Sequence, residues 1–88
     1  MITLVRWNGE PIAEGKSLRE VVEAHESDLA LADLTNQDLT GARLDGADLG
    51  GANLQRADLR AADLRNARLL GARLAGARIT KDTRGFTR

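Results

Sequence analysis

Apolar residues recur at every fifth position through most of this chain. Starting at Leu29, the spacing continues without interruption to Ile79, which gives eleven five-residue units over residues 27–81. A helix cannot bring these residues to one side, because five residues turn a helix by about 500° and successive leucines step around its axis by about 140°. A flat strand fails as well, since an odd spacing sends neighbouring leucines to opposite faces. The chain must therefore turn between one leucine and the next.

Within each unit the residues alternate between apolar and polar before a short polar or small segment. Alanine stands two positions before the central residue in nine units, with Ser27 and Gln37 as the exceptions, and the position between is always polar. This alternation predicts a three-residue strand, and the two residues that follow suit a corner. Strand and corner in repetition predict a solenoid with a core of central residues: Leu29, Leu34, Leu39, Leu44, Leu49, Leu54, Leu59, Leu64, Leu69, Leu74 and Ile79.

The units have the form of a known repeat. Successive units GADLG, GANLQ, RADLR and AADLR, at residues 46–65, closely resemble the A(D/N)LXX consensus of pentapeptide repeat proteins. The resemblance implies an all-β solenoid, a right-handed quadrilateral β-helix with twenty residues per coil and under three coils in all. The period of five by itself also allows a three-sided coil. This chain departs from the consensus where arginine replaces Asp or Asn at the outward position, at Arg43, Arg68, Arg73 and Arg78.

The first 26 residues have a different character. Asn8-Gly9 lies between two apolar-rich segments, which is a strong hairpin signal. Ser17 and Glu20 have the spacing of a helix N-terminal capping box. The segment is therefore predicted to be a hairpin–helix cap over the first coil, with a separate ligand-binding module as the alternative and 82–88 as a C-terminal tail. The predicted apolar face of the helix consists of Leu18, Val21, Val22 and His25.

The composition argues against an enzyme and against a metal-binding protein. The chain has 88 residues, no cysteine and a single histidine, His25, for which a capping or packing role is expected. The carboxylates are spread evenly along the chain rather than clustered, which is unsuited to acid–base catalysis or metal binding. We therefore expect a single-domain protein that is not an enzyme, has no cofactor or metal, lies in the cytoplasm and does not bind membranes.

Formal charge is zero overall but unevenly distributed along the chain. Residues 1–66 carry twelve acids and seven bases, whereas 67–88 carry six bases and one acid. At twenty residues per coil, the C-terminal arginines would stack under acids of the preceding coil. They either balance those acids or form a basic binding surface at one end.

The leading functional hypothesis is a non-enzymatic protein–protein interaction module, with a protein partner of unknown identity and self-association into a homodimer. The expected interface consists of Leu70, Phe86, Arg68, Arg73 and Arg78. A hairpin–helix cap before a short array also resembles small proteins carried by phages and prophages, which implies an inhibitor of a host or defence enzyme.

The alternative function is DNA mimicry. Some longer members of the family that the chain resembles have acidic flanks, are similar to a DNA duplex and inhibit DNA gyrase by occupying its DNA site. Residues 27–81 would give only about 13 Å of rod, which corresponds to about four base pairs. Direct nucleic-acid binding is disfavoured by the neutral overall charge and the scarcity of aromatic residues. The acidic face for mimicry would consist of Asp28, Asp33, Asp38, Asp48, Asp58 and Asp63.

Overall fold

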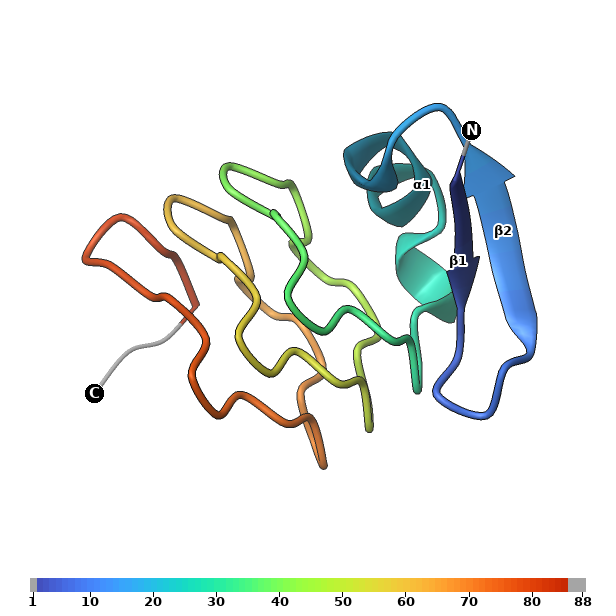
Figure 1. The fold of residues 1–88 in the computed structure, drawn as a ribbon. Helices are drawn as coiled ribbons and strands as arrows, with labels where there is room; N and C mark the ends of the chain where they lie inside the picture. The colour runs from blue at the N-terminus through green and yellow to red at the C-terminus, as the bar shows by residue number, and fades with distance from the viewer. Residues whose placement is uncertain (1, 86–88) are drawn as a thin grey trace.

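The computed structural model describes residues 2–85, in which a hairpin and a helix cover one end of a solenoid (Figure 1). Strand β1 (Ile2–Val5) pairs antiparallel with β2 (Pro11–Gly15). The turn between them contains Gly9, whose φ of 90° favours glycine. Helix α1 (Leu18–Ala24) and the short 3₁₀ helix η1 (Glu26–Asp28) follow. No helix among the described residues is long and apolar enough to cross a membrane.

Helix α1 begins directly after Ser17, the predicted capping residue. The Ser17 hydroxyl accepts a hydrogen bond from the Glu20 N–H at 3.2 Å. The return bond falls one residue earlier than a capping box requires, because the Lys16 N–H donates to the Glu20 carboxylate at 3.4 Å. Val21 and Val22 are buried, whereas His25 is exposed. The apolar face therefore does not include His25, because the helix ends at Ala24 and His25 serves as its C-cap.

Beyond residue 31 the backbone forms a β-helix solenoid. The Leu34 N–H donates to the Asn53 carbonyl at 2.8 Å, and the Asn53 N–H donates back to the Ala32 carbonyl at 2.9 Å. These hydrogen bonds bridge Asp33 and Asn53, which are twenty positions apart, and we call each such stretch of twenty residues a coil. This pairing recurs in four series of parallel bridges: Asp33–Asn53–Arg73, Asp38–Asp58–Arg78, Arg43–Asp63 and Asp48–Arg68.

Each corner of the solenoid is a tight turn with a left-handed residue. At one corner the Ala57 N–H donates to the Leu54 carbonyl at 3.0 Å, and Arg56 between them has φ 61°. This is the arrangement of a type II turn, in which the third residue has positive φ. The outward Asp or Asn before the corner stabilises it by accepting a hydrogen bond from the N–H two residues later, at 3.0 to 3.2 Å. The residues that do so are Asp33, Asp38, Asp48, Asn53, Asp58 and Asp63.

The core follows the repeat and thins toward the C-terminus. The central residues from Leu29 to Leu64 are at most 1% exposed, and the alanines beside them at 32 to 62 are buried too. Leu69 and Leu74 are only partly buried, and Ile79 is 41% exposed. These last three differ from the fully inward placement that the period predicts, because among the described residues they have a neighbouring coil on one side only.

The N-terminal segment supplies hydrogen-bond partners to the exposed edge of the first coil. The N–H groups of three outward residues on that edge each find an acceptor at 2.8 Å. Asp33 donates to the Val5 carbonyl, Arg43 to the Glu23 carboxylate and Asp48 to the Glu26 carbonyl. Strand β1, α1 and η1 thus all meet the edge that the first coil leaves open. Because buried or half-buried backbone donors need partners, these contacts stabilise the start of the solenoid.

The bridge ladder continues past residue 81. Arg84 bridges Asp63, which lies twenty-one rather than twenty residues earlier. The extra residue is accommodated by Thr83, whose buried hydroxyl donates to the Leu59 carbonyl at 2.7 Å and accepts from the Thr80 N–H at 3.2 Å. The sequence pattern assigned both Thr83 and Arg84 to the tail 82–88, because one added residue breaks a period of five. In the structure they lie with the solenoid.

Candidate functional site

Arginine occupies the last outward position of all four bridge series. We call this set the arginine collar, and it consists of Arg68, Arg73, Arg78 and Arg84. All four side chains are exposed, and each bridges a residue of the preceding coil that is Asp or Asn. The sequence identified the first three members. It missed Arg84, because the extra residue before it moves it off the period of five.

The fold explains the collar only in part: beside the hydrogen bonds from Arg60 and Arg65 that chiefly lower the pKa of Asp58 and Asp63, the charges of Arg78 and Arg84 lower it further. Asp and Asn at this position hold the next corner through a side-chain hydrogen bond, and arginine cannot accept one. At Arg68, Arg73 and Arg78 the replacement therefore gives up an interaction worth about 1 kcal/mol. Among the described residues no carboxylate lies within 4 Å of a collar guanidinium. The four charges are consequently available to a partner.

The acidic positions, in contrast, are largely engaged within the chain. Arg60 contacts Asp58 at 2.6 Å and Arg65 contacts Asp63 at 2.7 Å. Hydrogen bonds from these arginines lower the pKa of both aspartates from their ordinary value to about 2. Asp28, which lies in η1 rather than on a strand, accepts from the Arg6 guanidinium at 2.8 Å.

This pairing weakens the acidic face on which DNA mimicry depends. Three of its six predicted members form ion pairs with arginine. The other three, Asp33, Asp38 and Asp48, hold corners through hydrogen bonds. A rod with alternating arginine and aspartate lacks the sustained negative charge of a duplex.

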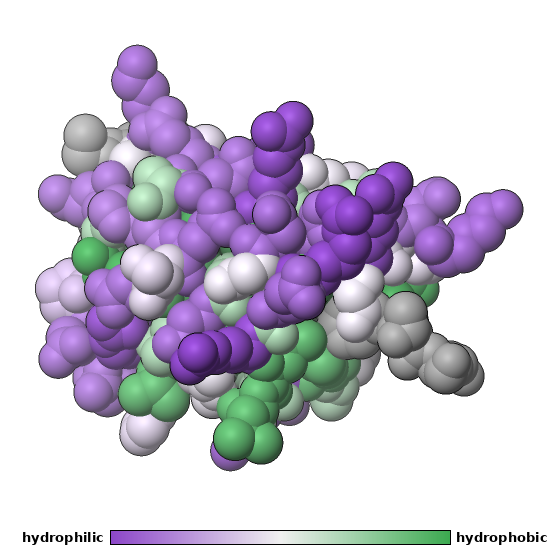
Figure 2. Space-filling view, turned by 180° about the vertical axis from the view of Figure 1, so that it is seen from behind, coloured by the Kyte–Doolittle hydropathy of each residue, from purple (hydrophilic) through white to green (hydrophobic). Residues whose placement is uncertain are grey.

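Large apolar side chains are exposed beside the collar and at the hairpin turn. Leu70 is 91% exposed, Ile79 is 41% exposed and Trp7 is 63% exposed. Figure 2 shows apolar side chains gathered along the lower edge of one face, whereas polar residues cover most of the remainder. Of the interface predicted from sequence, Leu70 lies at a corner between Arg68 and Arg73, and Phe86 lies outside the described residues.

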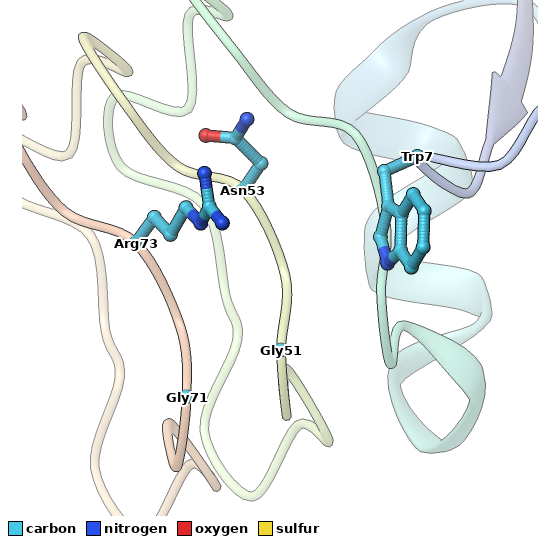
Figure 3. Close-up of a pocket in the computed structure, with 5 residues that line it drawn as sticks. All are labelled: Trp7, Gly51, Asn53, Gly71 and Arg73. Atoms are coloured by element: carbon cyan, nitrogen blue, oxygen red, sulfur yellow. The ribbon is translucent and has the colours of Figure 1, made fainter.

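A pocket of about 300 Å³ lies between the hairpin turn and one side of the solenoid (Figure 3). Trp7 forms one wall, and the outward residues Asn53 and Arg73 of successive coils form the other. Gly51 and Gly71, at equivalent corners of successive coils, also line it. The repeat pattern predicts no role for Trp7, and the one signal in the sequence is an aromatic residue beside the Asn8-Gly9 turn.

Residues 24–56 and 52–81 match the family model for pentapeptide repeats, with eight copies of the repeat. The chain belongs to the pentapeptide repeat family. No curated protein matched this pentapeptide repeat protein.

Two solved structures of pentapeptide repeat proteins from cyanobacteria are similar to the chain. HetL of Nostoc sp. strain PCC 7120, which is involved in heterocyst differentiation regulation, is 36% identical with a TM-score of 0.53. That match covers 64% of this chain and 28% of HetL. Rfr23 of Cyanothece 51142 is 38% identical with a TM-score of 0.39, over 69% of this chain and 45% of Rfr23. The chain therefore spans less than half the length of either protein.

Proposed function

We propose that this pentapeptide repeat protein is a non-enzymatic binding module that docks through its arginine collar onto an acidic surface of a partner protein. The observation that carries the proposal is the collar itself: four exposed guanidinium groups around one coil, each at an outward position where the preceding coil has Asp or Asn. Arginine is enriched at the energetically important centres of protein interfaces, where it forms bidentate bonds to carboxylates.

The exposed apolar residues beside the collar support docking of a protein. Leu70 and Ile79 lie in the same part of the chain as the collar and keep much of their surface in water. Interfaces commonly combine an apolar centre, in which arginine is also enriched, with a polar rim. The partner expected here presents acidic residues around an apolar patch, and its affinity falls as salt screens the charges.

The form of the solenoid is part of the proposal. We propose the right-handed quadrilateral β-helix of under three coils that the family resemblance implied, and four bridge series at a spacing of twenty or twenty-one residues support its four sides. A rigid rod of this kind fixes the collar arginines relative to one another, which reduces the entropy lost on docking.

In the homodimer expected from the sequence, a second copy of the chain would occupy the same surface. A symmetric contact through the collar would place four arginines opposite four arginines, and like charges at close range repel. Acidic residues of a different protein satisfy the collar without this repulsion. We therefore propose a heterologous partner, and a second copy becomes an outcome of the test.

The experiment compares capture of proteins from a bacterial lysate by three forms of the chain. The collar variant carries Arg68→Gln, Arg78→Gln and Arg84→Gln. The matched control carries Arg56→Gln, Arg60→Gln and Arg65→Gln, which changes the net charge equally at corner positions. We expect an acidic protein that the wild type and the control capture to be lost with the collar variant and at high salt.

Equal capture by all three forms would contradict the collar as the docking surface. Light scattering of the purified wild type at micromolar concentration tests whether a second copy of the chain binds the collar. A homodimer through the collar would have twice the 9.5 kDa mass of the chain, and the collar variant would change that measured mass. If the captured protein is an enzyme, its activity in the presence of the chain tests the inhibitory role suggested by the sequence.

A further inference from the structure

The pocket beside Trp7 is a second feature that the solenoid does not require. The backbone N–H of Trp7 donates to the Leu31 carbonyl at 2.9 Å. This hydrogen bond ties the hairpin turn to the first coil and so fixes the position of the pocket. The indole nevertheless remains 63% exposed. Figure 3 shows the ring on one side of the pocket and the side chains of Asn53 and Arg73 on the other.

The two glycines of the pocket differ in what the fold demands of them. A Cβ at Gly51 would lie 2.7 Å from Cδ2 of Leu31, so that corner has no room for a side chain unless Leu31 moves. A Cβ at Gly71 would meet only Gly51 backbone atoms at 3.7 Å, which is ordinary contact.

The φ of 76° at residue 71 favours glycine, but this chain tolerates other residues in that conformation. Ala61 occupies the equivalent corner position with φ 61°, so this chain already accepts alanine in that conformation. Gly71 therefore leaves the pocket open where packing would permit alanine.

The chemistry of the pocket favours a ligand that is both acidic and apolar. Arg73 supplies a guanidinium, Asn53 a carboxamide and Trp7 an apolar ring, and no acidic residue lines the pocket. Among the described residues Arg73 forms no ion pair within 4 Å. A carboxylate can pair with the guanidinium while an adjacent apolar group covers the indole.

We propose that this pocket binds an acidic side chain of a partner protein segment, with a neighbouring apolar residue of that segment packed on Trp7. The volume of about 300 Å³ lies at the lower limit for small-molecule sites and suits one or two side chains. Tryptophan and arginine are also the residue types most enriched among interface hot spots. This site goes beyond the proposed function and does not rest on it.

A nucleic-acid strand fits the pocket less well. Proteins that track single strands place several cations along the path of the phosphates. The outward residues of this bridge series are Asp33, Asn53 and Arg73, which gives one cation, one neutral group and one acid along the rod. A single carboxylate matches this arrangement better than a row of phosphates.

The test uses Trp7 as its own probe, since it is the sole tryptophan of the chain. The full chain is titrated with the blocked tripeptide acetyl-Leu-Asp-Leu-amide and with its neutral counterpart acetyl-Leu-Asn-Leu-amide, followed by fluorescence and by calorimetry. We expect the acidic peptide to bind at least about tenfold more tightly, because a charge-assisted hydrogen bond distinguishes the two.

Two pairs of variants locate the binding. Arg73→Gln should abolish the preference for the acidic peptide, whereas Arg43→Gln, at an outward position outside both the collar and the pocket, should keep it. Gly71→Ala should weaken binding several-fold by filling the pocket. Gly46→Ala is its control, because Gly46 has a similar φ of 74° and a Cβ there meets nothing within 4 Å.

Several results would overturn the proposal. These are equal affinity for the two peptides, no heat or fluorescence change up to millimolar peptide, an acidic preference that survives Arg73→Gln, or equal loss with Gly46→Ala and Gly71→Ala. Tighter binding of oligothymidylate than of the acidic peptide would assign the pocket to nucleic acid and overturn it as well. The collar variant retains Arg73, so failure of the collar experiment leaves this result unaffected.

Discussion

Replacing leucine by alanine at three depths tests how the solenoid is stabilised. Leu54 and Leu74 follow outward residues of the same bridge series, one coil apart, but Leu54 is fully buried and Leu74 only partly. Leu70 is 91% exposed at a corner. If burial of the central leucines holds the coils together, the three substitutions must differ in cost in that order.

The magnitudes follow from what each side chain loses. Leu54→Ala removes three buried carbon atoms, worth about 2.4 kcal/mol by transfer, and leaves a cavity that brings the loss to about 3–4 kcal/mol. Leu74→Ala should cost about half as much, and Leu70→Ala less than about 0.5 kcal/mol. A chain of this length has a total stability of about 4–13 kcal/mol, so Leu54→Ala consumes a large part of it. Leu54→Asp, which buries an unpaired charge, should leave the chain unfolded.

Urea unfolding followed by circular dichroism measures the three free energies. The wild-type spectrum should show more β-structure than helix. The reasoning would be refuted if Leu54→Ala and Leu74→Ala were equally destabilising, or if Leu54→Asp melted like the wild type. Either result would mean that depth in the solenoid does not set the contribution of a leucine.

The remaining predictions concern the N-terminal segment and the acidic side chains. Deleting residues 1–26 should give an unfolded or aggregating product by circular dichroism and light scattering, because the first coil loses its partners; a soluble fragment with cooperative unfolding would contradict this. Glu23→Ala should lower the free energy of unfolding in urea by about 1–2 kcal/mol, since it removes the acceptor of the Arg43 N–H, whereas Glu23→Gln should retain much of the stability. Stability should fall as pH drops from about 4 to about 2, because the pKa of Asp58 is lower in the folded chain than the ordinary value that it regains on unfolding. Arg60→Gln should raise the pKa of Asp58 in an NMR titration and flatten that fall; an unchanged pKa would show that the ion pair is not formed in solution.

The repeat was predictable because its period admits few backbones. Fixed spacing of Leu and Ala identified the solenoid and its core, and the Asn8-Gly9 and Ser17 signals identified the hairpin and helix start. Each of these signals depends on residues that lie close together in the sequence. The structural use of the outward aspartates was not visible, because alternation marks a side chain as exposed without indicating the backbone N–H that it reaches.

The candidate sites were only partly predictable, since they depend on contacts between distant segments. Arg84 joins the collar through a one-residue shift that Thr83 makes possible. The pocket needs the hairpin turn to lie beside a corner of the solenoid, and no period in the sequence reports where Trp7 comes to rest. The loss of burial at Ile79 likewise depends on which side of a coil has a neighbour.

The contacts between the N-terminal segment and the first coil have a consequence for the order in which the chain folds. Every bridge in the solenoid joins residues about twenty positions apart, so a coil cannot close on itself and needs an existing edge to form against. The segment around β1 and α1 provides that first edge, and it leaves the ribosome before any coil does. Each later coil then closes a loop of the same modest length onto the coil before it, and the entropy of closure does not grow as the rod lengthens. Synthesis and folding can thus proceed in the same direction, one coil at a time.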